Sequence, residues 1–140
     1  MEQLKILIKQ LQYVTIFGIE KDIKMALNAN KKGKRFELQC SKMINAKFGT
    51  KVKRTPNSGG LDLKGDILCI DDNSIISEFS FECKNQEKLN IWKALEQSRN
   101  DAPSGKLPVV VFTKNHERDY IALEFEDFMN IVKELEDLRK

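Results

Sequence analysis

Apolar residues recur every three to four positions in the first part of the chain, which is the period of an amphipathic helix. These positions hold Leu4, Leu7, Ile8, Leu11 and Val14, and then Ile19, Ile23 and Leu27. The pattern predicts two helices over residues 2–29, or one helix broken near Gly18. A further helix is predicted over residues 34–48, with Phe36, Cys40, Met43 or Ile44, and Phe48 on its buried side. Gly49 suits the end of that helix, because glycine readily adopts the left-handed conformation found after many helices.

Strand and helix patterns follow one another in the rest of the chain. Strands are predicted over residues 51–55, 66–70 and 75–84, with turn-forming residues at 57–60 and 71–73. A helix over residues 89–100, with Ile91, Leu95 and Ser98 on one side, precedes an apolar strand over 109–113. A short strand over 120–123 and a closing helix, Phe125–Leu138, complete the series. This order predicts an α/β fold, a small mixed β-sheet flanked by helices, with an extra N-terminal helical segment.

The length and composition fit one globular domain. Of the 140 residues, 41% are hydrophobic and 32% are charged, which is enough for a core and a well-solvated surface. We therefore expect a single domain over residues 1–140, in which residues 1–30 extend a core formed by residues 31–140. No apolar stretch approaches the ~20 residues that span a bilayer. Because no secretory signal is recognisable either, we expect a cytoplasmic protein without a membrane partner.

Cysteine and histidine are too few and too dispersed for several kinds of site. Cys40, Cys69 and Cys83 form no Cys-x-x-Cys pair, and His116 is the only histidine. A structural zinc site needs four such ligands, usually in closely spaced pairs. Most hydrolases with a Ser-His-Asp triad need a histidine at a defined place. We expect three buried thiols in a reducing compartment.

Positive charge is concentrated in one region, although the net charge is only +3. Between residues 31 and 54 there are nine basic residues and a single acidic one, Glu37. The basic residues are Lys31, Lys32, Lys34, Arg35, Lys42, Lys47, Lys51, Lys53 and Arg54. The segment after Glu117 is mainly acidic. This clustering suggests a surface that binds a polyanion, although charge alone fits a solvated surface equally well.

Asp66, Glu82 and Lys84 form the combination that suggests chemistry. Side chains alternate between the two faces of a strand, so Glu82 and Lys84 should point one way and Phe81 and Cys83 toward the core. If the strands over 66–70 and 75–84 pair as a hairpin, Asp66 comes close to Glu82. Two adjacent carboxylates repel unless a cation lies between them or one is protonated.

Mg²⁺ is a cation that takes one or two protein carboxylates and completes its shell with water and phosphate oxygens. The backbone carbonyl of Cys83 could add an oxygen ligand, and Lys84 could position or deprotonate an attacking water. The trio therefore suggests metal-assisted hydrolysis of a phosphodiester. The alternative is ordinary surface charge, since 32% of the chain is charged. The position of Glu82 and Lys84 at the end of an apolar strand favours the chemical interpretation.

Taken in order, the motifs resemble the PD-(D/E)xK nuclease superfamily, and within it the small archaeal-type Holliday junction resolvases and their viral relatives. The resemblance covers residues 31–113. It consists of a Lys-Gly-x-x-x-Glu pattern from Lys32 to Glu37, a strand containing Arg54, a Ser/Gly loop, Gly65-Asp66 and Glu82-Cys83-Lys84. It implies a restriction-endonuclease-like sheet, Mg²⁺ as cofactor with Mn²⁺ as a substitute, and branched or four-way DNA as the substrate.

The resemblance also implies roles for residues outside the trio. Glu37 matches a helical glutamate that completes the metal site, Ser58 lies in a loop that approaches phosphate, and Gln97 matches a glutamine on the following helix. The residues expected to contact DNA are Lys31, Lys32, Lys34, Arg35, Lys53, Arg54 and Ser58. Such resolvases act as homodimers, which implies a homodimer here. Residues 1–30 depart from the pattern, because those proteins begin near the Lys-Gly motif.

Three other functions remain open from the sequence. The chain could be a restriction, repair or nicking nuclease of the same fold, which a panel of DNA structures would distinguish from a resolvase. It could be a DNA-binding module without catalysis, although the presence of Asp66, Glu82 and Lys84 argues against this. A protein-interaction domain built on the N-terminal helices is the third possibility, but it leaves the ordered series of motifs unexplained.

Overall fold

The structure is a computed structural model that describes residues 2–54, 66–69 and 73–140. Ser58 and residues 71–72 of the expected turn lie outside the described residues. The chain divides into two compact units, Met1–Lys32 and Gly33–Lys140. The expectation of a single domain over the whole chain stays a prediction. None of the described helices is long and apolar enough to span a bilayer.

One uninterrupted helix, α1 (Glu2–Phe48), replaces the separate N-terminal helices that the sequence suggested. The predicted break near Gly18 and the gap before residue 34 are therefore wrong. A single glycine inside a helix costs only ~1 kcal/mol relative to alanine, and no proline occurs before residue 56. The helix ends where predicted, because Gly49 adopts a left-handed φ of 64° and its N–H donates to the Asn45 carbonyl at 2.9 Å.

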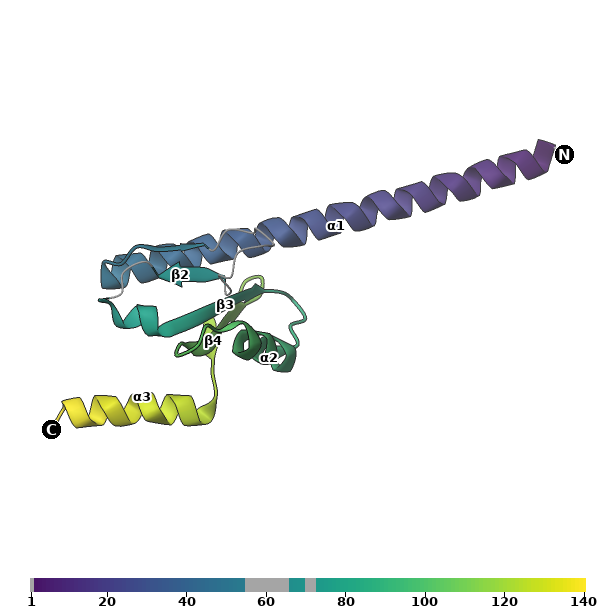
Figure 1. The fold of residues 1–140 in the computed structure, drawn as a ribbon. Helices are drawn as coiled ribbons and strands as arrows, with labels where there is room; N and C mark the ends of the chain where they lie inside the picture. Colours follow the sequence, from purple (N-terminus) through teal and green to yellow (C-terminus); the bar gives the residue numbers. More distant parts are fainter. Residues whose placement is uncertain (1, 55–65, 70–72) are drawn as a thin grey trace. The chain divides into compact units, whose positions relative to one another are not determined.

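The second unit contains a mixed sheet of five strands among the described residues, in the order β1-β2-β3-β4-β5. The strands are β1 (Val52–Arg54), β2 (Ile67–Cys69), β3 (Phe79–Asn85), β4 (Leu107–Thr113) and β5 (Tyr120–Ala122). β3 and β4 run parallel and are connected through α2 (Ile91–Asp101), whereas the other neighbours pair antiparallel. The chain ends in α3 (Phe125–Leu138). The predicted class, a mixed sheet flanked by helices, is confirmed (Figure 1).

The segment before β3 differs from the predicted strand over 75–84. Ile75–Glu78 forms a short 3₁₀ helix, η1, and extended structure begins only at Phe79. The Ser74 side chain accepts a hydrogen bond from the N–H of Ile76 at 3.2 Å. This local capping bond competes with strand pairing. The strand is therefore shorter at its start than its apolar pattern suggested.

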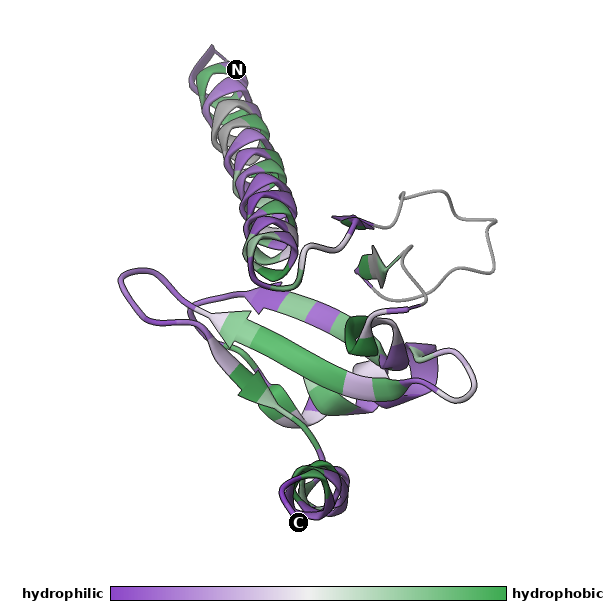
Figure 2. Ribbon diagram, turned by 90° about the vertical axis from the view of Figure 1, so that its left-hand side faces the viewer, coloured by the Kyte–Doolittle hydropathy of each residue, from purple (hydrophilic) through white to green (hydrophobic). Residues whose placement is uncertain are grey.

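The core lies between α1 and one face of the sheet. Phe36 and Cys40 on α1 pack in one cluster with Phe81, Cys83 and Val109. In Figure 2, β4 is almost continuously apolar, whereas the neighbouring β3 alternates between apolar and polar residues. Phe81 and Cys83 pack in the cluster with α1, as predicted, and Ser80 and Glu82 are buried as well.

Fewer apolar side chains are buried in the last turns of α1 than the sequence predicted. Ile44 is partly buried, whereas Met43 is 56% exposed, so Ile44 is the residue that faces the core. Phe48 was predicted to be buried but is 50% exposed, because it is the last residue of the helix.

The helix α2 covers the other face of β3 and β4 (Figure 1). Its buried residues are Ala94 and Ser98, and the Ser98 hydroxyl donates to the Val109 carbonyl at 3.3 Å. Ile91 and Leu95 are only half-buried. The two faces of the β3–β4 pair are thus covered by different helices, which leaves the ends of the strands as places where polar side chains can gather.

Candidate active site

Two hydrogen bonds to the backbone of β3 hold Asp66 beside that strand. The Asp66 N–H donates to the Phe81 carbonyl at 2.9 Å, and the Asp66 carboxylate accepts from the Cys83 N–H at 2.7 Å. Since Ile67 is the register partner of Phe81, the carboxylate of Asp66 reaches the stretch of β3 that carries Glu82. The expected approach of Asp66 to Glu82 through strand pairing is found.

Glu82 and Lys84 form an ion pair on the face of β3 opposite Phe81 and Cys83. The distance between Lys84 Nζ and Glu82 Oε1 is 3.0 Å, and the two side chains are 20% and 4% exposed. Residues two apart on a strand share a face, so this pair follows directly from the local sequence. Glu82 is far more buried than a carboxylate usually is, and its ion pair with Lys84 compensates part of the cost of desolvation.

The negative charge of the Asp66 carboxylate is less completely neutralised by its neighbours. Burial, and next the neighbouring Glu82 carboxylate, raise the pKa of Asp66 from 3.8 to about 6, against the opposing effects of the Cys83 N–H and Lys84. A half-buried carboxylate, Asp66, and a buried one, Glu82, thus share a single ammonium group. Such an arrangement is stabilised by a proton on one carboxyl or by an additional cation.

Glu37, on α1, lies in the same electrostatic environment. Its carboxylate accepts a hydrogen bond from Arg54 Nε on β1 and forms an ion pair with it. Burial, chiefly, raises the pKa of Glu37, and the charge of Asp66 adds to the rise, while Arg54 and Lys34 oppose it. Arg54 was predicted from the sequence as a DNA contact, and its pairing with Glu37 is a feature that sequence reasoning missed. The isolation of Glu37 within a basic run was the available signal.

The residues present fit a hard divalent cation. Among residues 2–54, 66–69 and 73–140, no group of three or more His, Cys, Asp or Glu side chains has the arrangement of a metal site. Mg²⁺ nevertheless needs only one or two protein carboxylates, since it retains several waters. The Asp66 and Glu82 carboxylates, under-neutralised by Lys84, supply that number. The raised pKa of Asp66 is the observation that supports this fit.

Asn45 is a second feature that sequence reasoning missed, and it positions the basic strand. Its side-chain amide accepts from the Val52 N–H at 2.7 Å and donates to the Val52 carbonyl at 3.0 Å. The amide thus serves as a strand partner and fixes β1 to the end of α1. An asparagine four residues before Gly49 was the only local signal. Arg54, two residues beyond Val52, is placed beside Glu37 as a result.

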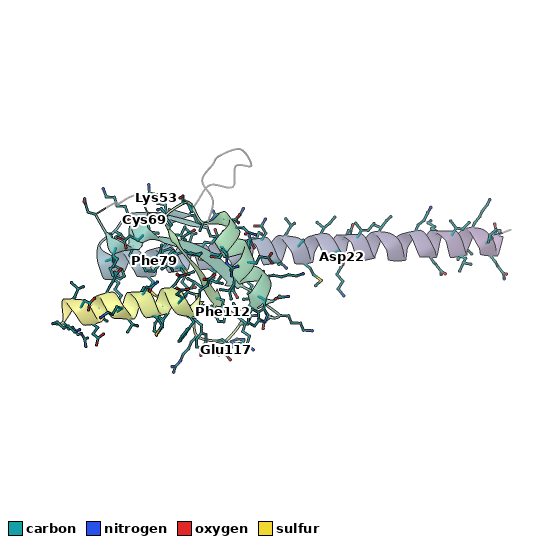
Figure 3. All side chains as sticks on the ribbon, turned by 60° about the horizontal axis from the view of Figure 1, so that its bottom comes forward. Asp22, Lys53, Cys69, Phe79, Phe112 and Glu117 are labelled. Atoms are coloured by element: carbon teal, nitrogen blue, oxygen red, sulfur yellow. The ribbon has the colours of Figure 1, made fainter. Side chains whose placement is uncertain are left out.

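The remaining predicted site residues are distributed as follows. Lys34, Arg35 and Lys53 are exposed on α1 and β1 of the second unit (Figure 3 shows Lys53), whereas Lys31 and Lys32 belong to the first unit. Ser58 lies outside the described residues. Gln97 is exposed on α2, and its predicted role stays a prediction.

The three cysteines are free and buried, as expected. A hydrogen bond to the Cys40 thiol, followed by burial, strongly raises the pKa of Cys83. The Cys83 thiol is therefore a protonated core group, and its side chain packs away from Glu82 and Lys84.

Comparisons with known proteins identify the family of the chain. Residues 28–139 match the model of the family described as "Phage putative PDDEXK endonuclease". The chain is 30% identical over 122 residues to Protein D14 of Escherichia phage T5, a match that covers 75% of this chain and 76% of that protein. No solved structure matches it. Because the family model matches most of the chain, this chain belongs to the phage PDDEXK endonuclease family.

Proposed function

We propose that the chain is a Mg²⁺-dependent endonuclease that hydrolyses phosphodiester bonds in branched DNA, acts as a homodimer, and uses Asp66, Glu82 and Lys84 as its active site. The observation that carries the proposal is the meeting of the half-buried Asp66 carboxylate, the buried Glu82 carboxylate and one ammonium group at β3. Membership of an endonuclease family supports phosphodiester hydrolysis as the reaction.

Asp66 and Glu82 would hold the metal ion, with the Cys83 backbone carbonyl as a further oxygen ligand and Glu37 assisting. When bound, Mg²⁺ or Mn²⁺ supplies Lewis acidity and offsets phosphate charge. Lys84 would orient the attacking water and take up or relay its proton. The contact of 3.0 Å with Glu82 fixes the position of Lys84 Nζ, and the Cys83 N–H fixes the Asp66 carboxylate in the same way.

The basic residues of α1 and β1 support a DNA substrate. Those proposed to contact phosphates are Lys31, Lys32, Lys34, Arg35, Lys53 and Arg54, together with Ser58. Such contacts bind backbone and shape rather than sequence. If about six phosphates are neutralised, the log–log dependence of affinity on salt should have a slope near about −5. Structure-selective binding is therefore favoured over sequence-specific cutting.

An exposed apolar stripe on α3 supports the homodimer. Phe125, Phe128, Met129, Val132 and Leu135 follow helical spacing and are 77%, 47%, 40%, 40% and 51% exposed. A stripe of this kind on a charged helix marks an interaction surface.

The test is cleavage of labelled four-way junctions, flaps, plain duplex and single strands with Mg²⁺, Mn²⁺ or EDTA. Wild-type protein should cut branched DNA with metal only. Asp66→Asn and Lys84→Met should each lower the rate by ~10²-fold or more while DNA binding persists. The matched control is Lys93→Met, which removes an exposed lysine side chain of α2 and should leave the rate unchanged.

Each arm of this test has an outcome that overturns a part of the proposal. Cutting plain duplex as fast as junctions would identify a restriction, repair or nicking nuclease of the same fold. Cleavage that survives Lys84→Met or EDTA would remove the assigned active site. A monomer at micromolar concentration by light scattering would remove the homodimer.

A further inference from the structure

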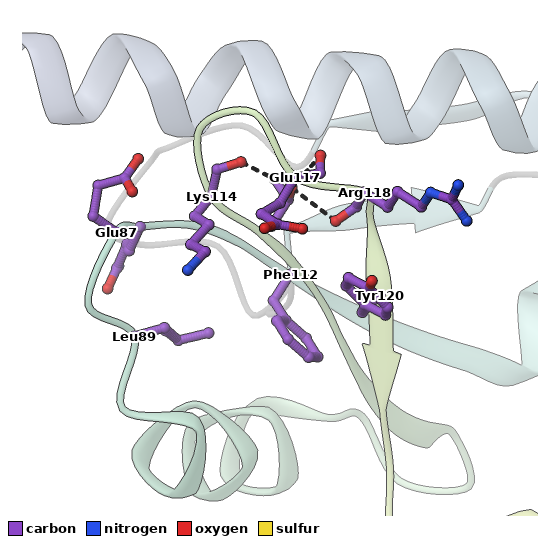
Figure 4. Close-up of a pocket in the computed structure, with 9 residues that line it drawn as sticks. Glu87, Leu89, Phe112, Lys114, Glu117, Arg118 and Tyr120 are labelled. Atoms are coloured by element: carbon purple, nitrogen blue, oxygen red, sulfur yellow. Dashed lines mark hydrogen bonds between the residues drawn. The ribbon is translucent and has the colours of Figure 1, made fainter.

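A pocket lies beyond the carboxyl ends of β3 and β4, outside the trio of the active site. It encloses about 310 Å³, which is the low end of the ~300–1,000 Å³ typical of small-molecule pockets. Its walls include Leu89, Phe112, Lys114, Glu117, Arg118 and Tyr120 (Figure 4). The space therefore suits one flat ring system rather than a peptide helix or a duplex.

Two aromatic rings form one wall of this pocket. Phe112 on β4 and Tyr120 on β5 are register partners, with ring centroids 5.9 Å apart and planes tilted by 31°. Tyr120 is 52% exposed. Exposed aromatic faces of this kind are stacking surfaces for unpaired bases, and stacking tolerates any base because every base has a π face.

The register of the sheet places this wall next to the active site. Lys84 on β3 is the parallel partner of Phe112 on β4, so the two side chains leave the same face of neighbouring strands, whose spacing is ~4.8 Å. Successive nucleotides of one DNA strand rise by ~3.4 Å. A base stacked on Phe112 and Tyr120 would therefore belong to a nucleotide about one or two positions from the phosphate at Lys84.

The loop that completes the pocket is held by hydrogen bonds. The Thr113 hydroxyl lies 3.1 Å from the Arg118 carbonyl and 3.3 Å from the Glu117 carbonyl, and the Asn115 N–H donates to the Glu87 carboxylate at 2.8 Å. A pocket with fixed walls binds without the cost of ordering them. Lys114 and Arg118 can attract the phosphates that flank a bound base. The Glu117 carboxylate can accept hydrogen bonds from amino or imino groups on the edge of that base.

We infer that this pocket binds one unstacked nucleobase of the strand being cut, so that DNA with separated strands is bound in preference to intact duplex. The inference rests on the proposed nuclease function and deepens it, because it assigns the selection of branched DNA to Phe112 and Tyr120. Taking a base out of a duplex costs a few kcal/mol, and least where the base is already unpaired. That difference is the source of the selectivity.

The experiment compares a forked DNA with a blunt duplex in binding assays that use Asp66→Asn as the cleavage-inactive background. Tyr120→Ala should weaken fork binding by about fivefold to a hundredfold, the loss expected for one base stack, and leave duplex binding unchanged. Tyr120→Phe, which keeps the ring, should retain the preference. Trp92→Ala is the matched control, because Trp92 is an aromatic residue of α2 with 79% exposure and lies outside this pocket.

A second measurement locates the base directly. Forked DNA carrying 5-iododeoxyuridine one or two nucleotides from the branch should crosslink, on irradiation, to a peptide containing Phe112 or Tyr120. Equal losses on fork and duplex for Tyr120→Ala, or crosslinks confined to other peptides, would overturn the inference. Neither readout needs cleavage, so an inactive protein that still binds the base would remove the proposed function alone, and an active protein without the crosslink would remove this inference alone.

Discussion

Replacing Asp66 by asparagine should stabilise the metal-free protein, and the gain should grow with pH. Burial and the adjacent Glu82 raise the pKa of Asp66 from 3.8 to about 6, so the folded protein holds this proton more tightly than the unfolded chain does. The stability that the protonated carboxyl contributes is present below pH ~3.8 and is lost as pH rises through about 6. Asparagine is neutral at every pH, and its side-chain oxygen can still accept from the Cys83 N–H.

The size of the effect follows from the shift. A rise of about two pKa units corresponds to ~3 kcal/mol at 1.36 kcal/mol per unit. At pH 7.5 the ionised Asp66 therefore lowers the free energy of unfolding by ~3 kcal/mol relative to a neutral group, whereas at pH 4 the penalty is only ~0.5 kcal/mol. Asp66→Asn should recover most of this penalty, and the gain should increase mainly between pH 4 and 7.

The assay is urea denaturation of wild type and Asp66→Asn in EDTA at several pH values, followed by circular dichroism. A repeat with 10 mM Mg²⁺ should raise the free energy of unfolding of wild type above pH 6 and leave that of Asp66→Asn unaffected, because a ligand stabilises only the protein that binds it. A gain that is the same at pH 4 and pH 7.5, or a destabilised variant at pH 7.5, would refute the assignment of a strained, under-neutralised carboxylate pair.

Three further substitutions test the elements that position the site, each by urea denaturation. Asn45→Ala should lower the free energy of unfolding by ~2–3 kcal/mol, because it removes both side-chain hydrogen bonds to Val52 and leaves backbone groups unsatisfied. A loss below 0.5 kcal/mol, roughly a weak hydrogen bond, would show that the Asn45 side chain does not hold β1 in place. Gly49→Ala should cost ~1–2 kcal/mol, since alanine is strained at a φ of 64°, and an unchanged midpoint would argue against that conformation. Ser98→Ala should cost ~1 kcal/mol through the lost bond to Val109, and a more stable variant would show that the bond contributes nothing.

The local sequence was sufficient to predict the structure where the spacing of apolar and polar residues alone decides it. The alternation of Phe81, Glu82, Cys83 and Lys84 fixes their faces in any pleated strand, so the pairing of Glu82 with Lys84 could be predicted without knowing the fold. The bounds of α3, Phe125–Leu138, were predictable for a related reason, because its apolar residues keep helical spacing from the first turn to the last.

Prediction failed where competing local signals have similar free energies. Gly18 reads as a helix breaker, yet the ~1 kcal/mol it costs is too small to end a helix with good helix formers on both sides. Ile76 fits the apolar pattern of a strand, yet capping by Ser74 turns the chain into η1. In both places the pattern of apolar residues allows two structures, and a difference of a kilocalorie or so selects one.

The sequence could not predict which cation pairs with which of the three carboxylates, Glu37, Asp66 and Glu82, and the reason here is different. Glu82 takes the ammonium of Lys84, two residues away, but Glu37 takes the guanidinium of Arg54, which is 17 residues away. Asp66 accepts a backbone N–H from Cys83, also 17 residues away. No local pattern reveals which carboxylate is held by a cation and which by a backbone amide. Burial and the neighbouring Glu82 carboxylate raise the pKa of Asp66 to about 6, so an added cation beside Asp66 would gain free energy by neutralising a carboxylate that burial and Glu82 destabilise.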